Sequence, residues 1–242
     1  MNTVINRNTG MRASVAMMAL AIVAGCSDSN NDSSDNDTTS VTQTYEITVS
    51  NLSSNQPFSP LAVVLHDESY QGWSVGASAT IGLEQLSESG DNTPFLAEAT
   101  DANVLAVASG DGVVAPGTSG SIELDINASS DVQLTVATML VNTNDAFAGN
   151  GGLDLSSLEL GAELMIRLPI YDAGTEGNNE LAGTIPGPAG GGEGFNSDRD
   201  DVDVVSRHPG VVSNVDGYID SVLEQSHRFD SPIAKLVVRR VN

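Results

Sequence analysis

Short segments with the period-two pattern of β-strands recur along this chain, and turn-forming residues separate them. Residues 44–52 and 119–126 alternate polar and apolar side chains, which is typical of strands with one buried face. Residues 61–65 form a short apolar run of the length of a fully buried strand. Further strands are predicted at residues 103–108, 131–141, 164–170 and 233–241. About seven short strands between Gly, Asn and Asp turns predict an all-β fold, an antiparallel β-sandwich.

Helical patterns are few. Residues 81–89 fit two helical turns that end before Gly90, and residues 214–225 have apolar residues at roughly helical spacing. We therefore expect one or two short helices that cover the sandwich. The side chains expected to face inward are Ile81, Leu83 and Leu86 in the first helix, and Val215, Ile219, Val222 and Leu223 in the second.

Residues 177–206 interrupt the strand pattern. They hold a run of glycines and then four aspartates within six residues, so we expect a long Gly- and Asp-rich loop. The glycine run is not a phosphate-binding loop, because no Lys-Ser or Lys-Thr follows it. The aspartates do not form an EF-hand either, because Asp201 stands where that loop needs glycine and Arg207 where it needs glutamate.

Residues 1–25 have the pattern of a bacterial lipoprotein signal peptide. Arg7 and Arg12 precede an apolar stretch at residues 13–24, which is shorter than the roughly 20 residues that span a bilayer. The stretch ends at Val23-Ala24-Gly25-Cys26, which resembles the lipobox, so Cys26 is the predicted lipidation site. Cys26 is the chain's only cysteine. An ordinary signal peptide with a chance cysteine is the alternative.

The rest of the chain divides into a tether and one domain. Residues 26–43 are nearly all Ser, Asn, Asp and Thr, so they bury little and are predicted to be a disordered acidic tether. Residues 44–242 are long enough for one sizeable domain. This order predicts a lipid-anchored protein of the bacterial cell envelope. Ser27 favours the outer membrane, with a periplasmic or surface-exposed orientation left open.

Charge limits the partners. The sequence has 32 acidic and 9 basic residues, a formal net charge of −23. Such a chain repels phosphate backbones, so no nucleic-acid partner is expected. Membrane contact is expected only through the N-terminal lipid anchor.

Three carboxylates follow two of the predicted strands. Asp145 comes after the strand at 131–141, while Asp172 and Glu176 come after the strand at 164–170, with Gly174 allowing a tight turn. If the two strands lie side by side, the carboxylates converge at one end of a sheet. Ca²⁺ takes roughly 6–8 oxygen ligands in such places. From spacing alone, a solvated acidic loop is the simpler interpretation.

Several motifs resemble the spondin N-terminal domain family. The matching stretches are Ser59-Pro60, Gly76-Ala77-Ser78, Gly82-Leu83, Glu88-Ser89-Gly90-Asp91, Leu153-Asp154, Asp172-Ala173-Gly174-Thr175-Glu176 and residues 234–240. This resemblance covers most of residues 44–242. It implies a sandwich related to C2 domains, with a calcium ion bound by acidic loop residues.

Carried onto this chain, the resemblance assigns the calcium ligands to Asp145, Asp172 and Glu176. Two departures matter. The family's Trp after the first Asp is Ala146 here, and Glu176 stands where the family has Asp. The longer Glu side chain can still give one or two oxygens. The expected affinity is that of extracellular modules, roughly 10⁻⁴–10⁻³ M or somewhat tighter.

An enzymatic alternative rests on Gly72-Trp73-Ser74-Val75-Gly76, which fits the G-x-S-x-G pattern of serine hydrolases. That motif needs a strand–turn–helix in a parallel α/β sheet, and the chain lacks alternating strands and helices. The three histidines, at 66, 208 and 227, show no zinc spacing. We therefore expect no enzymatic activity.

The sequence thus predicts a calcium-binding envelope lipoprotein that acts as a recognition or adhesion module. Its ligand would be a protein, a glycan or matrix material. The alternative is a structural lipoprotein in which calcium only stabilises the fold.

Overall fold

The computed structural model describes residues 41–230 and 232–242. The predicted signal peptide, Cys26 and most of the predicted tether lie outside these residues. Strand β1 (Thr42–Asn51) begins two residues before the predicted domain boundary. Its inward side chains Tyr45, Ile47 and Val49 are almost completely buried, as the alternating pattern predicts.

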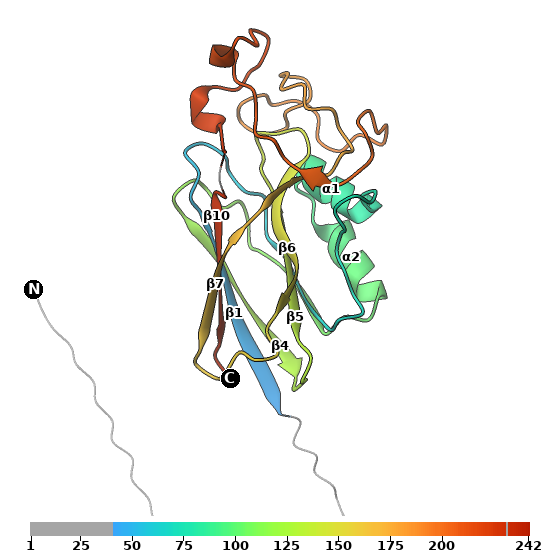
Figure 1. The fold of residues 1–242 in the computed structure, drawn as a ribbon, viewed down its shortest axis with the longest axis vertical. Coiled ribbons are helices and arrows are strands. Elements are labelled where there is room, and N and C mark those ends of the chain that lie inside the picture. Colours follow the sequence, from blue (N-terminus) through green and yellow to red (C-terminus); the bar gives the residue numbers. More distant parts are fainter. Residues whose placement is uncertain (1–40, 231) are drawn as a thin grey trace, which may run out of the picture. The chain divides into compact units, whose positions relative to one another are not determined.

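Two antiparallel sheets pack face to face as a sandwich (Figure 1). The first has four strands in the order β4-β1-β10-β7, with β4 at Ser119–Asn127, β7 at Glu163–Leu168 and β10 at Ala234–Arg240. The second has six in the order β3-β2-β5-β6-β8-β9. Its strands are β2 (Ala62–His66), β3 (Ala106–Ser109), β5 (Gln133–Met139), β6 (Ala146–Asp154), β8 (Ile170–Asp172) and β9 (Ser206–Arg207). The all-β sandwich prediction is confirmed.

Two helices cover the outer face of the six-stranded sheet (Figure 1). Helix α1 (Ile81–Ser89) contacts β5, and helix α2 (Thr93–Asp101) contacts β2. Every residue of β2 is therefore buried, between the helices on one side and the other sheet on the opposite side. This explains why residues 61–65 form a continuous apolar run rather than an alternating one.

The helix predicted at residues 81–89 is confirmed. Thr80 caps its first turn, with Oγ1 accepting from Leu83 N at 3.1 Å, and Gly90 ends it in the left-handed conformation at φ 73°. Leu83 is buried as predicted, whereas the inward placement of Ile81 is wrong, because 57% of that residue is exposed. No helix of the described residues is long and apolar enough to cross a membrane.

The helix predicted at residues 214–225 is wrong. Two short 3₁₀ turns stand there instead, at Asn214–Asp216 and Gln225–His227. Gly217 takes φ 99° and ends the first turn. Val215 and Ile219, predicted to face inward, are 70% and 85% exposed.

Strand β6 occupies a segment in which the sequence pattern predicted no strand. Its glycines leave room for Trp73, because a Cβ on Gly149 would lie 2.7 Å from the Trp73 ring and 2.7 Å from Val136 O. Glycines have no side chain to show the alternating pattern of a strand, so the sequence pattern did not reveal β6. The indole of Trp73 packs over this strand and leaves no room for larger residues.

Strands β5 and β7, which precede the carboxylates, do not lie side by side, so the condition stated for convergence of the carboxylates is not met in that form. β5 lies in the six-stranded sheet and β7 in the four-stranded one. The chain changes sheets at Pro169, and β8 then pairs with β6, with Asp172 opposite Ala146. Asp172 thus reaches the end of the six-stranded sheet through a short strand of its own.

Candidate cation site

Asp145, Asp172 and Glu176 come together at one end of the six-stranded sheet, although by a different route from the predicted one. Asp145 directly precedes β6, and Asp172 ends the neighbouring strand β8. The backbone N–H of Ala173 donates to Asp145 O at 3.3 Å. The backbone after Asp172 therefore passes directly beside Asp145.

The turn after β8 wraps around the Asp145 carboxylate. Asp145 Oδ2 accepts from the backbone N–H of Thr175 at 2.8 Å and of Glu176 at 3.2 Å. Gly174 makes this turn possible with φ 72°, and a Cβ there would lie 2.5 Å from Val204 O. The prediction that Gly174 permits a tight turn is confirmed.

Three buried carboxylate oxygens at this site have no hydrogen-bond partner in the described residues. They are Asp145 Oδ1, Glu176 Oε2 and Glu88 Oε1. Their residues are 0%, 5% and 1% exposed. None of the ion pairs found in the described part of the chain involves these carboxylates. Buried carboxylates without a compensating charge are costly unless they bind a proton or a cation.

Glu88 is the member of this cluster that the sequence prediction missed. It lies in the last turn of α1, and its Oε2 accepts from Asn196 N at 2.9 Å. Glu84, one turn earlier, is equally buried but pairs with Arg199 at 2.6 Å. At helical spacing both acids lie away from the side of Leu83 and Leu86, so no sequence signal indicated that they are buried; the long segment that holds Asn196 and Arg199 covers them.

The electrostatics favour protonation of these groups in the absence of a cation. Burial raises the pKa of Asp145 to about 7, and the charge of Asp172 adds to the shift. Burial also raises the pKa of Glu176 to about 8, with further contributions from Glu88 and Asp145. The pKa of Glu88 is raised by burial as well. Each group shifts because taking its charge out of water is unfavourable.

Asp172 is placed differently from the other carboxylates. Its Oδ1 accepts from Gly174 N at 2.8 Å, and its Oδ2 accepts from Asn178 Nδ2 at 2.6 Å. Both oxygens are therefore already engaged. Asp172 fixes the turn and contributes negative charge, while each of its oxygens keeps a lone pair that a cation can share.

The unpaired carboxylate oxygens are suitable ligands for a hard cation, but their side chains are not positioned around a single point. Unpaired carboxylate oxygens are the ligands that Ca²⁺ prefers. Within residues 41–230 and 232–242, however, no group of three or more His, Cys, Asp or Glu stands in an arrangement that could hold a metal ion. The carboxylates would have to adjust their side chains to share one ion.

The long segment after β8 packs around this site. As predicted, it forms neither helix nor strand between Asp172 and Ser206. Asp200 Oδ1 accepts from Gly177 N at 2.8 Å, and Asp203 N donates to Gly174 O at 2.7 Å. A Cβ on Gly187 would lie 2.3 Å from Val141 O, so the glycine run is closely packed against the β5–β6 turn.

The surroundings of Ser74 differ from a hydrolase nucleophile site. Ser74 lies exposed in the connection between β2 and α1. Both sheet neighbours of β2 are antiparallel to it, whereas a nucleophile elbow belongs to a parallel sheet.

Comparison with known proteins agrees with this architecture. The Spondin_N family model matches residues 25–182, which include β1 to β8, α1, Asp145, Asp172 and Glu176. Strand β10 lies beyond the match, although it pairs with both β1 and β7 in the four-stranded sheet. No curated protein matches the chain. The chain belongs to the spondin N-terminal domain family.

Proposed function

We propose that this chain is a cell-envelope lipoprotein whose spondin domain binds one calcium ion at the Asp145 site and serves as a recognition or adhesion module. The supporting observation is the cluster of three unpaired, buried carboxylate oxygens on Asp145, Glu176 and Glu88. A cation there neutralises charges that otherwise repel one another.

The ion would be held by Asp145, Glu176 and Glu88, with Asp172 beside them. Water and backbone carbonyls would complete the coordination. The bound ion supplies positive charge and joins three parts of the chain: helix α1, the residue before β6 and the turn after β8.

Calcium suits this donor set better than zinc or magnesium. Zinc sites are built mainly from Cys and His, whereas all the groups here are carboxylates. Mg²⁺ demands near-octahedral geometry, while Ca²⁺ tolerates irregular coordination by flexible side chains. Because the carboxylates have to adjust around the ion, the tolerant cation is favoured.

Thermal unfolding tests the calcium proposal. At a calcium concentration 100 times the dissociation constant, binding to the folded state adds about 2.7 kcal/mol of stability. For a domain of this size the Tm should rise by roughly 5–10 °C between EDTA and saturating calcium. Magnesium at the same concentration should give a smaller rise. Equal Tm values in EDTA and calcium would contradict a site in the folded domain.

Measurements of ligand binding and of Tm on surface variants distinguish a recognition role from a purely structural one. Val215 and Ile219 are exposed apolar residues in the connection that follows the long loop. Replacing either by serine should leave the Tm within about 1–2 °C, because neither side chain is buried. If the domain is a recognition module, these replacements should reduce retention on arrays of glycans and matrix proteins. Failure of the unmodified protein to be retained on any of these arrays favours the structural alternative.

A further inference from the structure

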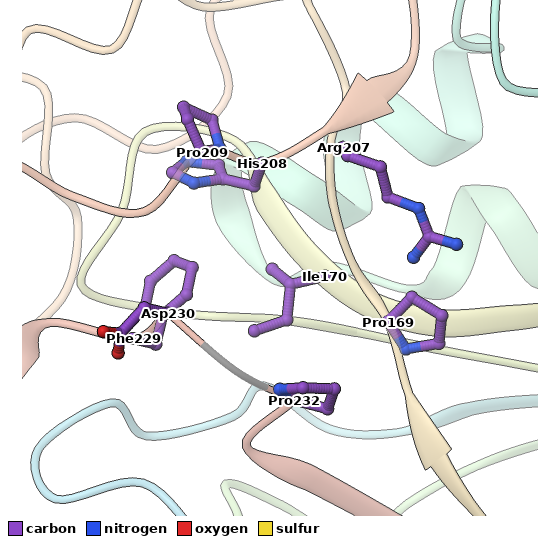
Figure 2. Close-up of a pocket in the computed structure, with 8 residues that line it drawn as sticks. All are labelled: Pro169, Ile170, Arg207, His208, Pro209, Phe229, Asp230 and Pro232. Carbon is purple, nitrogen blue, oxygen red and sulfur yellow. The ribbon is translucent and has the colours of Figure 1, made fainter.

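A pocket separate from the cation site lies at the same end of the molecule. Its volume is about 350 Å³, within the range of small-molecule sites. Three stretches distant in sequence form it: the start of β8, the residues around the end of β9, and the residues that precede β10 (Figure 2). The lining residues are Pro169, Ile170, Arg207, His208, Pro209, Phe229, Asp230 and Pro232.

The walls are mostly apolar and rigid. Prolines 169, 209 and 232 have fixed φ angles, and Ile170 lies at the centre of the group in Figure 2. The rings of His208 and Phe229 are 5.2 Å apart. Such walls favour the flat or branched apolar body of a small ligand.

Arg207 supplies a positive charge at the pocket. Its guanidinium lies 4.5 Å from the centre of the Tyr171 ring, which fixes its orientation. Arg199 and Arg228 form ion pairs, but Arg207 forms none with any carboxylate of the described residues. The guanidinium fork is therefore available to a carboxylate, which it can bind through two hydrogen bonds.

The other polar groups of the pocket are Asp230 and His208. In Figure 2 the Asp230 carboxylate lies on the side of Phe229 that faces away from Arg207. His208 is held in one tautomer, since its Nδ1 accepts from Gly210 N at 3.0 Å and its Nε2 donates to Asn178 Oδ1 at 3.1 Å. Asn178 in turn donates to Asp172. This wall is therefore fixed before a ligand arrives.

We propose that this pocket binds a small organic acid with an aromatic or branched apolar body, whose carboxylate pairs with Arg207. The apolar body lies against Ile170, Phe229 and the prolines. This site is distinct from the cation site, and its use of Arg207 does not require calcium.

The test is a titration with 3-phenylpropionate in which binding is measured from changes in the protein's NMR chemical shifts. The uncharged analogue 3-phenylpropionamide is the control ligand. Both are run in EDTA, so the result does not depend on the calcium proposal. The acid should bind about tenfold or more tightly than the amide, because only the acid gains the charged hydrogen bonds. Arg207→Gln should remove that preference. Arg239→Gln makes the same charge change on β10, outside the pocket, and should retain it.

Three results would overturn the proposal. One is equal affinity for acid and amide in the unmodified protein. Another is an acid preference that survives in Arg207→Gln. The third is binding of a peptide with a C-terminal phenylalanine but not of 3-phenylpropionate, which would assign the pocket to a protein partner.

Discussion

Replacing Asp145 by asparagine is expected to change stability in opposite directions with and without calcium. Without calcium at pH 8, the variant should unfold roughly 2–4 °C above the unmodified protein, because a buried, unpaired negative charge costing about 1 kcal/mol or more is removed. The asparagine oxygen can still accept the N–H groups of Thr175 and Glu176, so the turn is retained. With calcium, the variant should bind the ion at least about tenfold more weakly.

Thermal unfolding in EDTA and in calcium measures both effects. Asp111→Asn is the matched control, because it makes the same charge change at an exposed position in the turn between β3 and β4. The control should keep the calcium response of the unmodified protein. An Asp145→Asn variant that is less stable in EDTA and still gains stability from calcium would contradict the role assigned to Asp145.

Raising the pH is expected to destabilise the cation-free protein. The folded-state pKa values of Asp145 and Glu176 are about 7 and about 8, far above their ordinary values near 4. Protonated forms therefore predominate in the folded protein at pH 6.5, and ionisation costs stability as the pH rises through 7 and 8. Between pH 6.5 and 8.5 the loss should be about 2–3 kcal/mol, or roughly 5–10 °C in Tm.

Between pH 6.5 and 8.5 the change in stability comes from the carboxylates and not from the histidines. Burial lowers the pKa values of His66, His208 and His227, so their contribution to stability changes mainly below pH 6.5. Saturating calcium should remove most of the loss, because the ion binds the ionised carboxylates. A Tm in EDTA that stays level or rises from pH 6.5 to 8.5 would show that these groups are not buried and unpaired.

Strand periodicity predicted most of the fold because it reports burial directly. Tyr45, Ile47 and Val49 alternate along β1 and point into the core. The same reasoning failed for β6, where Gly149 is small because Trp73 packs over it from a distant part of the chain. No local pattern encodes that contact.

The cation site shows the same limit. The residue types made Asp145, Asp172 and Glu176 candidates, and the family resemblance assigned them as ligands, but the sequence did not show how the strands before them are arranged. Pro169 moves the chain from one sheet to the other, so only the tertiary structure explains how Asp172 comes to lie beside Asp145. Glu88 approaches from a helix, and sequence spacing gives no measure of that proximity.

The most direct test of the calcium site is titration by calorimetry of the unmodified domain and of an Asp145→Ala/Asp172→Ala double variant. The account predicts one calcium ion per unmodified chain, with a dissociation constant of roughly 10⁻⁴–10⁻³ M or somewhat tighter, and no measurable binding by the variant. Circular dichroism should first show that the variant is folded. Comparable calcium binding by the two folded proteins would contradict the assignment of the site.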